Sequence, residues 1–136
     1  MKRNKAIGYV RSAVYDPTGE VIKRMTEEVI DYCKSNKLDL DRIFMDNGAS
    51  GNNFNRLGWS EMKDYLQIER GKLRHLVVPD LSRIARNFCL FREEIKYLKE
   101  NFGLKIKPIN YRQMSLAPES LKKSRALNVE KGNRMR

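Results

Sequence analysis

The sequence is poor in the residues that build metal centres and disulfides. It has two cysteines and one histidine among its 136 residues, and neither cysteine has the spacing of a metal-ligand pair. Cys33 and Cys89 stand in apolar helical patterns, which predicts buried, reduced thiols rather than a disulfide. His75 alone cannot build a zinc site or a histidine-based catalytic dyad. The sequence therefore predicts no metal site.

Long apolar runs and acidic residues are scarce as well. No run approaches the roughly 20 apolar residues that a membrane-spanning helix needs, and the basic residues 1–5 lead into a short apolar strand rather than a signal-peptide core. These features predict a cytoplasmic protein without a membrane partner. Lys and Arg number 28 against 17 Asp and Glu, giving a net charge of +11. Such an excess favours a polyanionic partner, usually nucleic acid, over a merely basic protein.

The apolar residues alternate between strand and helix patterns. Strands are predicted at 5–13, 42–46, 75–79 and 104–110, and amphipathic helices over 21–33, 59–70 and 87–101. The length allows one domain. Alternating strands and helices with short connections predict an α/β fold with three layers, α/β/α, around a mostly parallel sheet of about four or five strands.

Polar residues follow three of the predicted strands. In a parallel sheet, ligands bind at the carboxyl ends of the strands, so these residues are expected to meet at one edge. The first strand leads to Arg11 and Ser12, the second to Asp46 and a loop with Ser50 and Arg56, and the third to Arg83 and Arg86.

Arg83 and Arg86 are predicted to lie on one face of the first turn of a helix, about 5–6 Å apart at Cβ. Their planar guanidinium groups suit phosphate oxygens. Four arginines without an acidic triad suit a phosphodiester, whose charge grows during transfer. The structural alternative is that Arg11 ends a strand, that Arg56 lies on a surface loop and that the other two form a solvated helix face.

Three segments, taken in order, resemble the serine recombinases, the family of resolvases, invertases and large serine integrases. They are Tyr9-Val10-Arg11-Ser12-Ala13, then Asp46-Asn47-Gly48-Ala49-Ser50-Gly51 with Arg56, and then Asp80-Leu81-Ser82-Arg83-Ile84-Ala85-Arg86-Asn87. The resemblance covers residues 5–110. Each motif alone is weak, whereas three in order are a strong signal.

The resemblance implies a resolvase-like fold with flavodoxin-like strand order. It also implies site-specific recombination, in which a serine cleaves and rejoins DNA through a 5′-phosphoserine linkage and a released 3′-hydroxyl, without metal or cofactor. Arg11, Arg56, Arg83 and Arg86 would neutralise the phosphate, with Asp46 near the site and Ser50 in its mobile loop. DNA is the implied partner, and the full-length parent would form a homo-oligomer.

The sequence departs from the family at the nucleophile. The attacking serine stands two residues after the first arginine, where this chain has Ala13. Side chains alternate along a strand, so Ala13 is expected on the face of Arg11 and Ser12 on the other. Three accounts stay open: an engineered substitution, a natural loss, or a local turn that lets Ser12 act. The alternative function is a non-catalytic DNA-binding or protein-interaction module derived from a serine recombinase.

The last residues differ in composition from the rest. Residues 1–112 are predicted to form the catalytic domain. Residues 113–136 are predicted to be a basic tail, either flexible or the stump of a truncated dimerisation helix.

Overall fold

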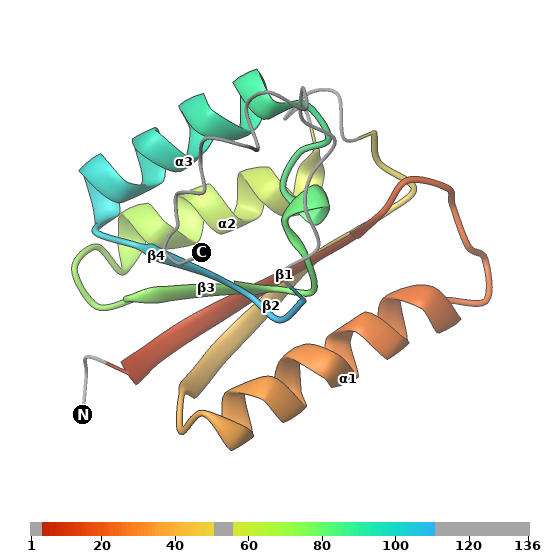
Figure 1. Ribbon diagram of the computed structural model, residues 1–136, viewed down its shortest axis with the longest axis horizontal. Coiled ribbons are helices and arrows are strands. Elements are labelled where there is room, and N and C mark those ends of the chain that lie inside the picture. Colours follow the sequence, from red (N-terminus) through yellow and green to blue (C-terminus); the bar gives the residue numbers. More distant parts are fainter. Residues whose placement is uncertain (1–3, 51–55, 111–136) are drawn as a thin grey trace, which may run out of the picture.

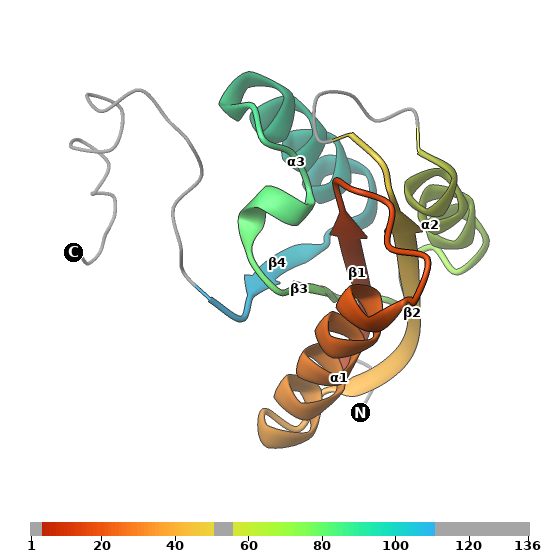
Figure 2. The same cartoon turned by 90° about the vertical axis from the view of Figure 1, so that its right-hand side faces the viewer.

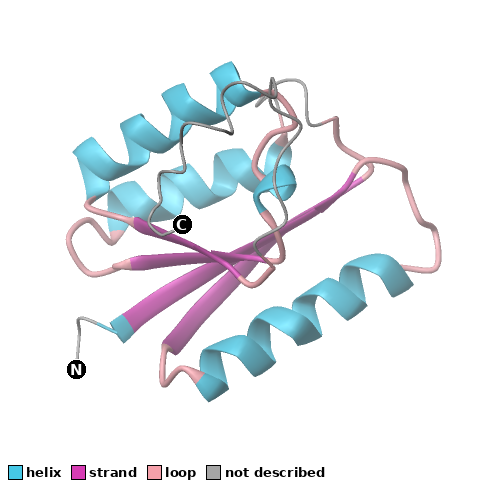
Figure 3. Ribbon diagram, viewed as in Figure 1, coloured by secondary structure: helices cyan, strands magenta, loops and turns pink. Residues whose placement is uncertain are grey.

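The computed structural model describes residues 4–50 and 56–110, so the predicted tail and part of the predicted mobile loop lie outside the described residues. Strands and helices alternate along the chain (Figures 1 and 3). In order they are β1 (Lys5–Ser12), α1 (Glu20–Ser35), β2 (Asp39–Asn47), α2 (Leu57–Ile68), β3 (His75–Val78), the short 3-10 turn η2 (Leu81–Arg83), α3 (Phe88–Phe102) and β4 (Lys105–Pro108).

The strands form a sheet in the order β2-β1-β3-β4, and all the pairings are parallel. This confirms the α/β fold and the flavodoxin-like order. The central strand β1 is buried from Ala6 to Ser12, as expected for an apolar strand covered on both faces. Because the strands are parallel, their carboxyl ends meet at one edge, where Arg11 of β1 pairs with Asp46 of β2.

Helices cover both faces of the sheet. Figures 1 and 2 show α1 on one face and α2 with α3 on the other, which confirms the three layers. The α1 side is closed by Ile22, Met25 and Val29, packed on sheet residues that include Val10. The larger core on the opposite side includes Tyr9, Trp59, Met62, Leu76 and Leu98. The buried apolar area of the two clusters stabilises the edge where the strands end.

The chain between β3 and α3 differs from its prediction. Asn87 caps α3 by accepting a hydrogen bond from the Leu90 N–H at 3.1 Å, so the helix begins at Phe88. Upstream, Asp80 caps η2 by accepting from the Ser82 N–H at 3.0 Å. The prediction that Arg83 and Arg86 lie in the first turn of a helix is therefore wrong. They occupy the 3-10 turn and the connection that follows it.

The cysteine prediction is half right. Both thiols are free and Cys33 is buried, but Cys89 is exposed near the start of α3. Burial raises the pKa of Cys33 to about 11, so this thiol stays protonated at neutral pH. Within the described part of the chain, no helix is long and apolar enough to span a membrane.

Candidate functional site

The carboxyl ends of the parallel strands form one edge of the sheet, called here the carboxyl edge, or the arginine edge after Arg11, Arg56, Arg83 and Arg86. Arg11 lies on its central strand β1 and is almost fully buried, with 1% of its surface exposed. Its Nη1 donates to the carbonyl oxygen of Ala49 at 2.7 Å, and its Nη2 to that of Ser82 at 2.7 Å. Its Nε donates to the carbonyl oxygen of Arg83 at 3.1 Å. One side chain on β1 thus connects the segments that follow β2 and β3, which are the second and third sequence motifs.

Arg56 precedes α2 and is also buried, with 3% exposed. Its Nη2 donates to the carbonyl oxygen of Ile84 at 2.6 Å, and its Nη1 to the Tyr9 hydroxyl at 3.2 Å. The guanidinium carbon lies 5.7 Å from the centre of the Trp59 ring, a favourable cation–π arrangement. The alternative of a surface-loop arginine is wrong.

Arg83 and Arg86 are more accessible than the other two arginines. Arg83 is partly buried and donates through Nη1 to the carbonyl oxygen of Arg11 at 3.0 Å. Its Nε lies 3.5 Å from Oδ2 of Asp80, an ion pair without hydrogen-bond geometry. Arg86 is exposed. These two side chains are the ones that an anion from solution can reach most easily.

The arginines act on one another electrostatically. Burial, together with the positive charges of Arg56, Arg83 and Arg86, lowers the pKa of Arg11 to about 10, against an opposing effect of Tyr9. Arg11 nevertheless remains protonated at neutral pH. The four arginines exceed the two aspartates of the edge, Asp46 and Asp80, so the edge attracts anions.

Asp46 supports the start of α2. It is 8% exposed and accepts hydrogen bonds from the N–H groups of Gly58 at 2.7 Å and Trp59 at 3.1 Å, a favourable place for a carboxylate. It also accepts from the Tyr9 hydroxyl at 2.7 Å. Burial, and then this bond to Asp46, raises the pKa of Tyr9 well above its usual range. The phenol therefore stays protonated and donates to Asp46.

The two candidates for the nucleophile position lie in different surroundings. Ser12 is 6% exposed, and its Oγ lies 2.8 Å from the carbonyl oxygen of Val14 and 3.1 Å from Oδ1 of Asn47. Ala13 follows the end of β1 and is exposed. Ser50, the other predicted loop residue, is exposed. The serine next to Arg11 is thus buried and hydrogen-bonded, while the exposed position carries no hydroxyl.

Asn47 and Gly58 are parts of the site that the sequence did not single out. Asn47 accepts from the Asp16 N–H at 2.9 Å and donates to the Asp16 carbonyl oxygen at 2.8 Å, which holds the chain after β1 against β2. A Cβ on Gly58 would lie 2.3 Å from the Met45 carbonyl oxygen. The signal for Asn47 was its place inside the second motif, whereas nothing local marks Gly58.

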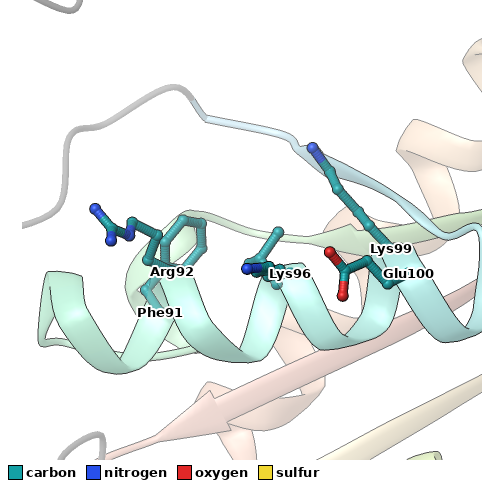
Figure 4. A pocket seen from close by; sticks show the side chains of 6 residues that line it. Phe91, Arg92, Lys96, Lys99 and Glu100 are labelled. Carbon is teal, nitrogen blue, oxygen red and sulfur yellow. The ribbon is translucent and has the colours of Figure 1, made fainter.

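Two surface hollows lie on the described part of the chain. One, of about 330 Å³, is lined by α3 side chains that include Phe91, Arg92, Lys96 and Glu100 (Figure 4). The other, of about 540 Å³, lies between α1 and the end of β2 and has Ile22 and Met45 in its wall. The four arginines line neither of these two hollows.

Comparison with known proteins identifies the family. The model of the resolvase N-terminal domain matches residues 6–119, which contain the sheet, the helices and the arginine edge. The chain belongs to this family. None of the curated proteins matches the sequence significantly. At family level, membership supports site-specific recombination.

Solved structures agree with the resolvase fold. The C-terminal catalytic domain of ISC1926 TnpA, an IS607-like serine recombinase, is 21% identical, with a TM-score of 0.67 over 80% of this chain and 72% of that one. The N-terminal catalytic domain of TP901-1 integrase is 17% identical, with a TM-score of 0.66 over 91% and 93%. A resolvase family site-specific recombinase from Streptococcus pneumoniae is 17% identical, with a TM-score of 0.65 over 77% and 71%. At these identities the structures show the fold alone.

Proposed function

We propose that the chain is the DNA-binding catalytic domain of a site-specific serine recombinase and that it does not cleave DNA in its present sequence. One observation carries the proposal. At the end of β1 the exposed residue is Ala13, while the neighbouring Ser12 is 6% exposed and hydrogen-bonded to main-chain and side-chain oxygens. An alanine cannot attack phosphorus, and a serine held in this way does not present its hydroxyl to a phosphate.

Two other hydroxyls of the edge, those of Ser82 and Tyr9, are no better placed to attack. Ser82 donates its hydroxyl proton to the carboxylate of Asp80, and Tyr9 is fully buried and donates to Asp46. The accessible guanidinium groups of Arg83 and Arg86 support binding of a DNA phosphate through charge-assisted hydrogen bonds. These contacts support binding of DNA without attack by Ser12, Ser82 or Tyr9.

Restoring the nucleophile tests the proposal. The chain, Ala13→Ser, Ala13→Ser with Ser12→Ala, and Ser12→Ala alone are incubated with a pool of random-sequence duplexes, and protein-linked DNA is recovered in SDS. In the Ala13→Ser protein, the serine Oγ forms a bond to phosphorus as the bond to the 3′-oxygen breaks and that oxygen leaves as a hydroxyl. We expect linked DNA from both Ala13→Ser proteins and none from the other two.

Other outcomes lead to different conclusions. Linked DNA from the unchanged chain that disappears in Ser12→Ala would make Ser12 the nucleophile. DNA binding by Ala13→Ser without any linked product would favour the second candidate, a non-catalytic DNA-binding module derived from a recombinase. The exposed Ala13 is the observation that favours that candidate.

A further inference from the structure

We propose that Tyr15 is a specificity-determining residue that stacks on an unpaired DNA base beside the arginine edge. The proposal rests on the proposed function, because it names the form of DNA that the same edge binds. Tyr15 lies in the loop of residues 13–19, which joins β1 to α1 (Figure 1). The inference concerns this loop and gives the arginines no new role.

Most of the exposed large apolar side chains lie at the carboxyl ends of the strands. In the described part of the chain they are Val14, Tyr15, Met45, Leu57, Ile68 and Tyr97. The first two lie in the loop after β1, Met45 lies near the end of β2, and Leu57 begins α2 beside it. Tyr15 is the aromatic residue among these four, and it is 64% exposed. Apolar side chains exposed together beside a polar site are typical of a binding surface.

Hydrogen bonds and close packing fix the main chain that carries Tyr15. The next residue, Asp16, donates its N–H to the Asn47 side chain at 2.9 Å, and its carbonyl oxygen accepts from that side chain at 2.8 Å. A Cβ on Gly48 would lie 2.8 Å from Cβ of Tyr15, so these two residues pack directly together. The exposed ring therefore starts from an ordered main chain, which lowers the conformational entropy lost on binding.

The segment after β2 connects this loop with the arginine edge. The N–H groups of Gly48 and Ala49 donate to the Ser12 carbonyl oxygen at 2.9 and 3.0 Å. The Ala49 carbonyl oxygen accepts from Arg11 Nη1 at 2.7 Å. Gly48 and Ala49 thus link the position of Tyr15 to that of Arg11. A DNA strand with a phosphate at the arginine edge would bring its neighbouring nucleotides close to the Tyr15 ring.

An exposed aromatic ring beside cationic side chains has the chemistry that recognises unpaired bases. Every base has a flat face that stacks on an aromatic ring, while basic side chains attract the backbone. In an intact duplex, both faces of a base are covered by its neighbours, so Tyr15 can stack only on a base that has left the duplex. Bases beside a cut strand lose their partners during strand exchange, which suits site-specific recombination.

A second copy of the chain is the competing occupant of this surface. Two copies that met through Val14 and Tyr15 would bring two arginine edges close together. Their like charges, added to a net charge of +11 on each chain, oppose that contact. DNA carries the opposite charge, so the charge of the surroundings favours DNA as the occupant.

The affinities for paired and unpaired bases test the proposal. A fluorescent duplex, and the same duplex with one unpaired base at its centre, are titrated with the chain, Tyr15→Ala, Tyr15→Phe and Ile68→Ala. We expect the unpaired base to raise the affinity of the unchanged chain about tenfold. Tyr15→Ala should abolish this gain, whereas Tyr15→Phe, which keeps the ring, should retain it. Ile68→Ala should retain it too, because Ile68 is 75% exposed but ends α2 at the opposite edge of the sheet.

A fluorescent adenine analogue at the unpaired position reports the stacking itself, because its emission falls when it stacks on an aromatic ring. We expect this quenching when the unchanged chain or Tyr15→Phe binds, and none when Tyr15→Ala binds. Equilibrium urea unfolding of the same proteins is expected to show equal stability for the chain and the two Tyr15 variants, since the side chain is exposed.

Other results would overturn the proposal. Equal affinity of the unchanged chain for both duplexes, or a Tyr15→Ala protein that keeps the gain, would remove Tyr15 from the DNA contact while the proposed function stands. A dimer seen by sedimentation that dissociates in Tyr15→Ala would assign the surface to a second copy. An unchanged chain that binds neither duplex would overturn the proposed function together with this inference.

Discussion

Tyr9, Asp46 and Arg56 form a chain of buried polar side chains beneath the arginine edge. The Tyr9 hydroxyl donates to Asp46 at 2.7 Å and accepts from Arg56 at 3.2 Å. Asp46 and Arg56 are charged residues and are buried, so each depends on hydrogen bonds that replace those to water. Tyr9 therefore stabilises the fold through its oxygen as well as its ring.

Substitution of Tyr9 by phenylalanine removes that oxygen and keeps the ring. We expect the free energy of unfolding to fall by about 1–3 kcal/mol, because Asp46 loses a donor and Arg56 an acceptor. Equilibrium urea unfolding measures the change. Tyr15→Phe is the matched control, since Tyr15 is 64% exposed and its loss of a hydroxyl should change little. Equal stability of the Tyr9 variant and the parent would mean that the hydrogen bonds of the Tyr9 hydroxyl do not contribute to the stability of the fold.

For single residues, the sequence predicted which side chains form the site better than it predicted their hydrogen bonds. Arg11, Arg83 and Arg86 were expected together because they follow parallel strands, and the pKa of Arg11 responds to both of the others. The burial of Arg11 and Arg56 was not predicted. Their acceptors are carbonyl oxygens of Ala49, Ser82 and Ile84, and main-chain oxygens leave no mark in residue identity.

Among the secondary-structure elements, the contact of α2 with β2 decides where the helix begins. Asp46 accepts from the N–H groups of Gly58 and Trp59, which brings the first turn of α2 against the end of the strand. At Gly58 a Cβ would lie 2.3 Å from the Met45 carbonyl oxygen and 2.8 Å from Oδ2 of Asp46. Only glycine permits this approach.

Gly58→Ala tests the contact between α2 and β2. The added methyl group must push the helix away from β2 and weaken the bonds to Asp46, so we expect a loss of about 1–3 kcal/mol in the free energy of unfolding. Ser60→Ala, an exposed position on the same helix, is the control and should change stability by less than about 0.5 kcal/mol. A Gly58→Ala protein as stable as the control would show that helix and strand are not closely fitted.

The elements themselves were largely predictable, while their connections were not. The apolar patterns gave every strand and helix of the described chain, with ends displaced by a few residues. Arg83 and Arg86 precede α3 and do not lie in its first turn, because Asn87 supplies the cap of α3 and Asp80 closes a separate 3-10 turn. Both residues are good caps, and spacing alone does not show which one starts a helix.

For the whole molecule, the alternation of strands and helices was sufficient to predict a parallel sheet with helices on both faces. The four parallel strands and the match to the resolvase N-terminal domain confirm that expectation. The sequence did not predict how deeply the side chains of the site are buried. Chain order indicates which side chains share an edge, but the packing of α2 against the sheet determines that Arg56 is buried there.

The charge of the molecule agrees with the proposed partner. An excess of 11 positive charges attracts DNA in general, whereas the arginine edge would hold a phosphate at a defined place. A general attraction and a defined contact differ in one respect. Removing an arbitrary basic side chain weakens the general attraction only slightly. Removing an arginine that binds a phosphate removes one defined contact with DNA.

The salt dependence of DNA binding is the measurement that tests the arginine edge most directly. Arg86→Gln and Arg74→Gln remove the same charge from exposed positions, but Arg74 precedes β3 and lies at the opposite edge of the sheet. For a fluorescent duplex titrated over a range of KCl concentrations, we predict that the slope of log affinity against log salt falls by about 0.9 in Arg86→Gln and is unchanged in Arg74→Gln. Equal slopes for the two variants would contradict a phosphate site at the carboxyl edge.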